Sequence, residues 1–392
     1  MSSNTSMYLK QDNGIPADFK GGYFDIRGEP YIVREGNNYV NADPLTDYIH
    51  WVIAFIVMPT VSIVGIIGNS ISLAVLFKHG FNKSSNVLLF SLAISDILFM
   101  IGVNGPPKAM YEWGGGGFQY PEATAHALYY LYHIFDSLNW GSGPPSLFIP
   151  VLITIERLVA VFLPLRFTSI VTPKRTTVVV IGSNVVSYGV QIYVRTWFEF
   201  VYVFDTARNA SVGYAARTAA YWTQRGANNI IAIFVNCLMI LVIFVFCGSI
   251  AIGIKIKLAS NKRLQMTNNA TAGKQNTKRE AGTSRTTKML LCLCFFYAIA
   301  CAPIGLPVFI PGFMSFPVYT EEPNFHSVGV FIYHIYKLIY CINASVNFFI
   351  YVLMSRSFRQ TFLGLFPCVN GKQTNSQIST TELSHSRTTI RD

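Results

Sequence analysis

Apolar side chains dominate seven long stretches of the chain, and polar or charged segments separate them. The stretches lie at about 51–77, 85–104, 128–163, 177–203, 229–256, 289–315 and 327–353. Most of them exceed about 18 residues and contain few charges, which is typical of helices that cross a bilayer. The pattern therefore predicts an all-α membrane protein built as a bundle of seven transmembrane helices.

The third stretch is the most irregular, because it contains Asp136 and the prolines Pro144, Pro145 and Pro150. Proline has no backbone N–H and leaves a carbonyl of the preceding turn without its partner. Such residues survive in a spanning helix only where other groups satisfy the freed backbone. We therefore expect neighbouring helices or waters to bond these carbonyls.

The composition fits a membrane protein, since 51% of the 392 residues are hydrophobic and only 12% are charged. These figures exclude a disordered chain, a collagen, a coiled coil and a small disulfide scaffold. The formal net charge of +11 would suit nucleic acid, but nine basic residues and one acid lie between Lys255 and Lys288. Positive charge concentrated in one loop between apolar stretches reflects membrane topology instead, so we expect no nucleic-acid partner.

The basic residues of the short connecting segments predict the orientation of the bundle. One alternating set of segments holds Lys78, Lys83, Arg166, Lys174, Arg175, the cluster at 255–288, Arg356 and Arg359. The other set is poorer in Lys and Arg. Segments rich in Lys and Arg stay on the cytoplasmic side of a membrane. We therefore expect a multi-pass protein of the plasma membrane with its N-terminus extracellular and its C-terminus cytoplasmic.

This topology divides the chain into four parts. Residues 1–49 form a polar extracellular tail without a cleavable signal peptide, and residues 50–354 form the seven-helix domain. Residues 355–368 have the spacing of a short amphipathic helix on the inner leaflet, where they would contact membrane lipids. Residues 369–392 form a cytoplasmic tail rich in Ser and Thr.

Three residues outside the apolar stretches are candidates for covalent modification. The sequons at Asn4 and Asn209 fall on the extracellular side and predict glycosylation. Cys368 follows the amphipathic segment and is a candidate for palmitoylation. The other six cysteines lie inside apolar stretches, so we expect neither a disulfide framework nor a metal site.

Ionisable side chains inside the apolar stretches are the strongest functional candidates, because a charge in the bilayer is costly. Asp96 lies midway along the second stretch and predicts a cation site or proton relay, unless it is only a hydrogen-bonded structural acid. Arg157 follows Glu156 at the end of the third stretch, where an interfacial charge pair is the alternative. Lys337 in the seventh stretch needs a partner, such as Asp136 or an anion of a ligand.

Enzyme signatures are absent from the sequence, which has no HExxH, no GxxxxGK[ST] and no nucleophile elbow. We therefore expect a protein that is not an enzyme. An intramembrane protease would need paired catalytic groups at one depth, and only Asp96 is clearly deep. A transporter or channel with Asp96 and Lys337 on its path is the other alternative, but the internal repeats frequent in transporters are not seen.

Five motifs in sequence order resemble the rhodopsin-like (class A) family of G-protein-coupled receptors, over about residues 50–368. They are GIIGN with Gly68 and Asn69, LAISD with Asp96, ERL with Glu156, Arg157 and Leu158, CAP with Pro303, and NFFIY with Asn347 and Tyr351. Each motif lies on the stretch where the family carries it. The resemblance implies a seven-helix receptor that passes an extracellular signal to a heterotrimeric G protein.

The resemblance also implies roles for particular residues. G-protein coupling would use Glu156, Arg157, Tyr351 and Lys288. A sodium ion, the one cofactor considered, would bind at Asp96, Ser146, Asn343 and Asn347. The activation switch would include Cys301 and Pro303. Receptor kinases and arrestin would act on the tail between Thr374 and Thr389.

Departures from the family pattern limit this transfer. The third stretch lacks the cysteine of the family disulfide, and Tyr132 stands at its place. The loop at about 204–228 must therefore be held in another way. Cys301 replaces the family's toggle tryptophan, and Phe348 replaces the proline of NPxxY. These changes leave open a divergent receptor that is silent or constitutively active.

The ligand class is narrowed by two further positions. Asn139 stands where aminergic receptors carry an aspartate, and Cys341 stands where opsins carry the Schiff-base lysine. The expected ligand pocket consists of Tyr132, His133, Asp136, Asn139, Tyr333 and Lys337. Aromatic groups and charges of both signs suit a short peptide, or alternatively a small polar chemosensory ligand. The overall pattern is most similar to invertebrate peptide and chemosensory receptors.

Overall fold

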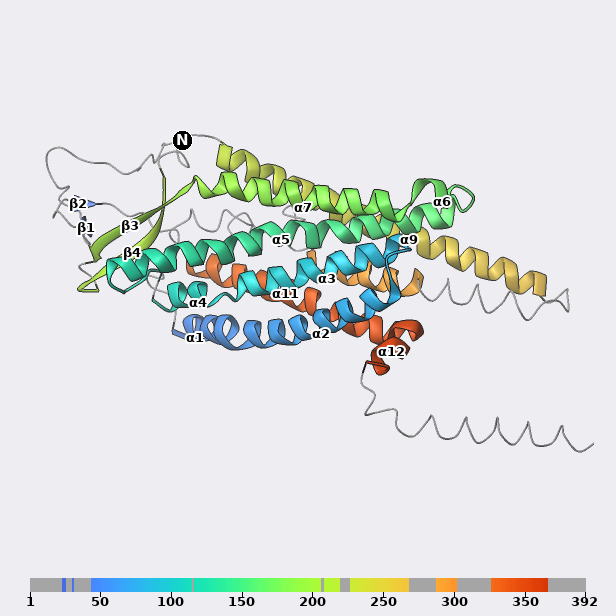
Figure 1. Cartoon of the computed structure of the whole chain (residues 1–392), viewed down its shortest axis with the longest axis horizontal. Helices are drawn as coiled ribbons and strands as arrows, with labels where there is room; N and C mark the ends of the chain where they lie inside the picture. Colours follow the sequence, from blue (N-terminus) through green and yellow to red (C-terminus); the bar gives the residue numbers. More distant parts are fainter. Residues whose placement is uncertain are drawn as a thin grey trace, which may run out of the picture.

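The computed structural model describes residues 23–25, 30–31, 44–114, 116–205, 208–218, 226–267, 287–301 and 326–365 (Figure 1). Long helices run side by side along the molecule, a β-hairpin lies at one end, and a short helix turns away at the other. The helices are α1 (Pro44–Val52) and α2 (Met58–His79), joined by a π-helical turn (Ile53–Val57), then α3 (Ser84–Val103), α4 (Pro106–Trp113), α5 (Glu122–Phe162), α6 (Phe167–Ile170), α7 (Pro173–Arg195), α9 (Gly226–Thr267), Thr287–Cys301, α11 (His326–Met354) and α12 (Arg356–Leu363). The strands are β1 (Tyr23–Asp25), β2 (Pro30–Tyr31), β3 (Phe198–Asp205) and β4 (Ala210–Arg217).

The predicted all-α membrane bundle is confirmed. Within the described ranges, 6 helical segments are long and apolar enough to cross a membrane. They are Tyr48–His79, Ser84–Trp113, Glu122–Phe162, Pro173–Arg195, Ile240–Ala259 and His334–Met354. The helix Thr287–Cys301 is apolar but shorter, and the rest of the expected sixth stretch lies outside the described residues.

The fourth stretch differs from the prediction, because its helix ends at Arg195 and not near residue 203. Residues Phe198–Asp205 form strand β3, which pairs antiparallel with Ala210–Arg217. Aromatic and β-branched side chains dominate β3 and favour a strand. A short apolar run of this kind has the same hydropathy as the end of a spanning helix, which explains the error.

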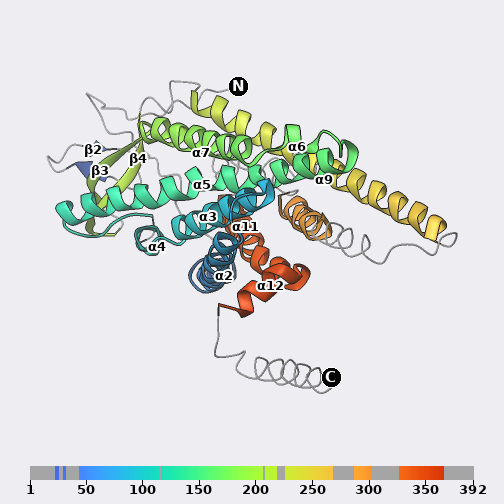
Figure 2. The same ribbon diagram turned by 45° about the vertical axis from the view of Figure 1, so that its right-hand side comes forward.

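Helix α7 satisfies a backbone carbonyl that one proline of α5 releases. The Gly141 carbonyl is the acceptor that Pro145 cannot reach, and Ser187 Oγ of α7 donates to it at 2.8 Å. The Tyr188 and Ser142 hydroxyls lie 2.6 Å apart at the same contact. Helix α7 lies along the side of α5 that faces away from α2 (Figure 2), so this contact joins an outer helix to the central one.

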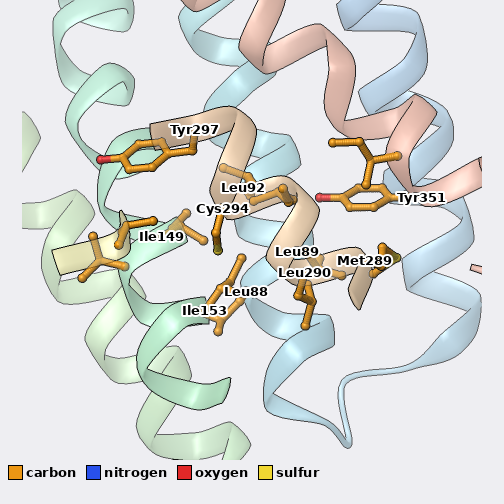
Figure 3. Packing of buried hydrophobic residues seen from close by; sticks show 14 of the residues in the cluster. Leu88, Leu89, Leu92, Ile149, Ile153, Met289, Leu290, Cys294, Tyr297 and Tyr351 are labelled. Atoms are coloured by element: carbon orange, nitrogen blue, oxygen red, sulfur yellow. The ribbon is translucent and has the colours of Figure 1, made fainter. Parts of the chain in front are cut away.

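The hydrophobic core surrounds the helix Thr287–Cys301, which lies toward the end of the bundle away from the hairpin (Figure 1) and is seen from close by in Figure 3. The labelled side chains come from α3, α5, this helix and α11: Leu88, Leu89, Leu92, Ile149, Ile153, Met289, Leu290, Cys294, Tyr297 and Tyr351. All of them are buried. The core therefore locks four helices together just beside the residues expected to contact a G protein.

Candidate ligand and transducer sites

Asp96 lies fully buried between α3, α5 and α11, as expected for an acid in mid-span. Ser146 Oγ donates to Asp96 Oδ1 at 2.5 Å, and Asn347 Nδ2 donates to Oδ2 at 2.7 Å. Asn343 is only half-buried, and none of the described hydrogen bonds joins it to Asp96. The structure thus brings three of the four expected sodium ligands together, and their role in sodium binding stays a prediction.

Arg157 lies near the C-terminal end of α5, in a cluster of three residues. Its Nη2 atom lies 2.5 Å from Glu156 Oε1 and donates to Ser85 Oγ at 2.9 Å. Ser85 in turn donates to Glu156 Oε1 at 2.6 Å. Ser85, Glu156 and Arg157 therefore each contact the other two. Sequence reasoning missed Ser85, since a serine at the start of a spanning helix carries no signal.

The other expected transducer residues surround this cluster. Tyr351 is buried, and its hydroxyl has no hydrogen-bond partner among the described residues. Lys288 is exposed at the start of the helix Thr287–Cys301. Within that helix Cys294 lies 3.4 Å from Thr154 Oγ1 of α5 (Figure 3 shows the neighbourhood of Cys294). A movement of this helix would therefore break a contact one turn from Arg157.

The expected activation switch is described only in part. Cys301 is fully buried at the last described position of its helix. Pro303 lies outside the described residues. Tyr297, one turn before Cys301, is also fully buried, and its hydroxyl lacks a partner among the described residues. A switching role for these groups stays a prediction.

At the hairpin end, ion pairs join α5, α11 and α4. Lys108 Nζ lies 2.6 Å from Asp136 Oδ1. Lys337 Nζ lies 3.8 Å from Glu112 Oε1, and His334 Nε2 lies 3.8 Å from Glu112 Oε2. Asp136, one of the two partners suggested for Lys337, thus has its described ion pair with Lys108, and Lys337 lies near Glu112. Helix α4 supplies a counter-charge to each, and sequence reasoning missed Lys108 and Glu112 because both follow the second apolar stretch.

The remaining residues of the expected pocket lie at this same end. Tyr132 is half-buried against Tyr111, with ring centroids 5.0 Å apart. His133 and Asn139 are buried on α5. The backbone of Asn139 packs so tightly against Gly102 that a Cβ there would lie 2.3 Å from Asn139 N. The side chain of Tyr333 lies outside the described part of the chain.

The β3–β4 hairpin is held over these residues without a disulfide. Phe118 and Gly213 exchange two backbone hydrogen bonds, of 2.9 and 3.0 Å. Arg208 Nη1 donates to the Gly114 carbonyl at 2.9 Å. Strand β1 extends the sheet in the order β2-β1-β3-β4. Backbone hydrogen bonds and the Arg208 side chain thus hold the hairpin in place of the family's disulfide.

The expected modification sites are described unevenly. Asn209 is exposed in the turn of the hairpin and has a positive φ of 49°. Asn4 and Cys368 lie outside the described residues. The amphipathic helix is observed as α12, and its Phe358 is buried 5.5 Å from the Tyr351 ring. Glycosylation of Asn4 and Asn209 and palmitoylation of Cys368 stay predictions.

A bundle of apolar helices with a buried mid-span acid, a clustered Glu-Arg pair at one end and a hairpin at the other agrees with the seven-helix receptor class that the sequence motifs indicate. The chain belongs to the serpentine-type 7TM GPCR chemoreceptor Srw family, whose profile matches residues 56–369. It is therefore a G-protein-coupled receptor in a multi-pass membrane fold. The family implies an extracellular ligand and a G protein as partners, and a receptor and not an enzyme.

Three relatives support this assignment. A galanin-like G-protein coupled receptor, npr-9 of Caenorhabditis elegans, is 23% identical over 365 residues, which cover 84% of this chain and 79% of the relative. The FMRFamide receptor of Drosophila melanogaster is 24% identical, with 78% of this chain and 52% of the relative covered. Neuromedin-U receptor 2 of Homo sapiens is 25% identical, with 82% and 73% covered. The expected similarity to rhodopsin-like receptors is confirmed.

Proposed function

We propose that this receptor binds an extracellular peptide and activates a heterotrimeric G protein through Arg157. The observation that carries the proposal is the set of buried or half-buried charges of both signs at the hairpin end, Lys108, Asp136, Glu112 and Lys337. A peptide offers charged and aromatic groups that can compete for such pairs. Relatives named as galanin-like, FMRFamide and neuromedin-U receptors support the same ligand class.

The accompanying topology is part of the proposal. The receptor lies in the plasma membrane with the hairpin outside and Arg157 inside, because Lys and Arg cluster in the segments beside Arg157. A sodium ion at Asp96 favours the inactive arrangement. Phosphorylation of the tail by a receptor kinase recruits arrestin, and Cys368 and α12 anchor the end of the bundle to lipids.

A small polar ligand is the second candidate, because the family is described as one of chemoreceptors. The two candidates separate in a G-protein dissociation assay on cells that express the chain. The cells receive fractionated tissue extract before and after protease treatment, with Arg157→Ala as the control. A response lost in both the protease-treated and the mutant samples supports a peptide receptor. A response that survives protease points to a small ligand, and one that survives Arg157→Ala contradicts the coupling role.

A further inference from the structure

Two buried nitrogen atoms where α5 and α7 reach the hairpin lack a hydrogen-bond partner among the described residues. They are Nε2 of His133 on α5 and Nη1 of Arg195, the last residue of α7. The His133 side chain is 97% buried, since its exposed fraction is 3%. A buried polar group without a partner is costly, and nearly all such groups in native proteins are paired. Two of them near each other call for an acceptor that the described residues do not supply.

Aromatic rings connect these two groups. The Arg195 guanidinium carbon lies 5.7 Å from the centre of the Tyr129 ring. The Tyr129 and His133 ring centroids are 4.4 Å apart, in an edge-to-face contact. On the other side, His133 lies 5.5 Å from Phe198 of β3. Helix α5, the end of α7 and the hairpin therefore meet around one arginine and one histidine.

The other cations described at this end already have carboxylate partners. Lys108 is paired with Asp136, Lys337 lies near Glu112, and Arg208 Nε lies 3.2 Å from Asp205. Arg195 Nη1, by contrast, is buried and has no hydrogen-bond partner among the described residues. The donor that remains open at this end is thus on the guanidinium of Arg195.

We propose that Arg195 and His133 bind a carboxylate of the ligand, while Tyr129 and Phe198 hold the apolar group beside it. The guanidinium is suited to this task because its planar fork matches a carboxylate, and Nη1 is the free donor. The proposal rests on the proposed peptide receptor and narrows its ligand to a peptide with a carboxylate at the recognised end. That carboxylate belongs either to the C-terminus or to an acidic side chain.

Binding of small probes to the purified full-length receptor tests the proposal directly. The probes are N-acetyl-phenylalanine, which mimics a C-terminus, N-acetyl-aspartate amide, which mimics an acidic side chain, and N-acetyl-phenylalanine amide, which has no carboxylate. We expect at least one acid to raise the unfolding midpoint at millimolar concentration, whereas the amide does not. The acid that raises the unfolding midpoint more identifies the source of the carboxylate. Equal shifts for acids and amide, or no shift with any probe, would overturn the proposal.

Variants of α7 connect the effect to Arg195. Arg195→Gln should weaken binding of the acid by about ten- to a hundredfold, because a charge-assisted hydrogen bond is lost. Arg195→Lys keeps the positive charge but loses the planar guanidinium, so its affinity for the acid should lie between those of wild type and Arg195→Gln. Lys174→Gln is the matched control, since it removes one positive charge from the exposed far end of the same helix. Unchanged binding in Arg195→Gln, with normal yield of folded receptor, would contradict the assignment.

The two proposals fail in different ways. Probe binding is measured without a G protein, so it does not depend on signalling. Acid-selective binding in a receptor that never activates a G protein would support this site and remove the proposed function. A protease-sensitive G-protein response to peptides that keep full potency after loss of every carboxylate would do the reverse.

Discussion

Phe118 and Gly213 bond each other through both backbone N–H groups, at 2.9 and 3.0 Å, although 95 residues separate them in the chain. This pair fixes β4 to the segment that leads into α5. Rhodopsin-like receptors use a disulfide at this place, and Tyr132 stands where its cysteine would be. The backbone pair contains no thiol, so it does not respond to redox conditions.

Reducing agent should therefore leave the receptor unchanged. The described cysteines Cys237, Cys247, Cys292, Cys294, Cys301 and Cys341 are all free. We expect the same unfolding midpoint and ligand potency with and without dithiothreitol. A loss of either on reduction would contradict the account, because it would require a disulfide between cysteines that are free in the structure.

Gly213→Val tests the hairpin contact itself. A Cβ at Gly213 would lie 2.8 Å from Phe200 and 2.9 Å from Ala125, so the larger side chain should push β4 away. We expect faster proteolysis of the hairpin and a more than tenfold loss of ligand potency, of the order that a loss of about 1.4 kcal/mol produces. Gly189→Val is the control, because nothing lies within 4 Å of that position. Equal effects of the two variants would show that the contact at Gly213 does not determine ligand potency.

Ser85→Ala should raise signalling without ligand. Ser85 bonds both Glu156 and Arg157, and each bond holds the arginine in its present position. Loss of about 1 kcal/mol of net hydrogen-bond energy would shift the resting equilibrium about fivefold toward the active arrangement. Basal nucleotide exchange measures this shift at matched surface expression. Ser169→Ala, which alters an exposed serine, is the control. Basal exchange equal to wild type would show that Ser85 does not restrain Arg157.

Sodium should lower agonist affinity through Asp96. Ser146 and Asn347 orient its carboxylate, and an anion with preset neighbours is the natural ligand of a small hard cation. We expect agonist binding to weaken as sodium replaces choline in wild type, and to be insensitive to sodium in Asp96→Asn. Ser146→Ala should reduce the effect in part. Equal sodium dependence in wild type and Asp96→Asn would exclude the site.

The pair Lys108–Asp136 should couple α4 to α5. Its lysine side chain is 7% exposed and its aspartate 23%. Removing one partner from a buried pair costs about 3–5 kcal/mol, and the partial exposure of Asp136 places the cost of Lys108→Met at the lower end of this range. The double variant Lys108→Met with Asp136→Leu should recover most of the loss. Thermal unfolding of the purified receptor provides both values, and additive losses would contradict the pairing.

Hydropathy and motifs predicted the bundle and two neighbours of Asp96, Ser146 and Asn347, because both are local or follow helix periodicity. Strand β3 escaped, since its apolar residues have the hydropathy of a helix end. Lys108 and Glu112 escaped because α4 begins after the second apolar stretch, and only the folded bundle shows their depth. The partner of Lys337 depended on that same helix. Ser85 had no signal at all, since its role arises from where two helices meet.

Nucleotide exchange on a purified G protein tests the central claim most directly. The receptor is reconstituted in lipid nanodiscs with and without a protease-sensitive extract fraction that is active in cells. The account predicts exchange that the fraction accelerates in wild type and that Arg157→Ala abolishes, while the mutant keeps its unfolding midpoint. Acceleration that persists in folded Arg157→Ala, or its absence in wild type, would contradict it.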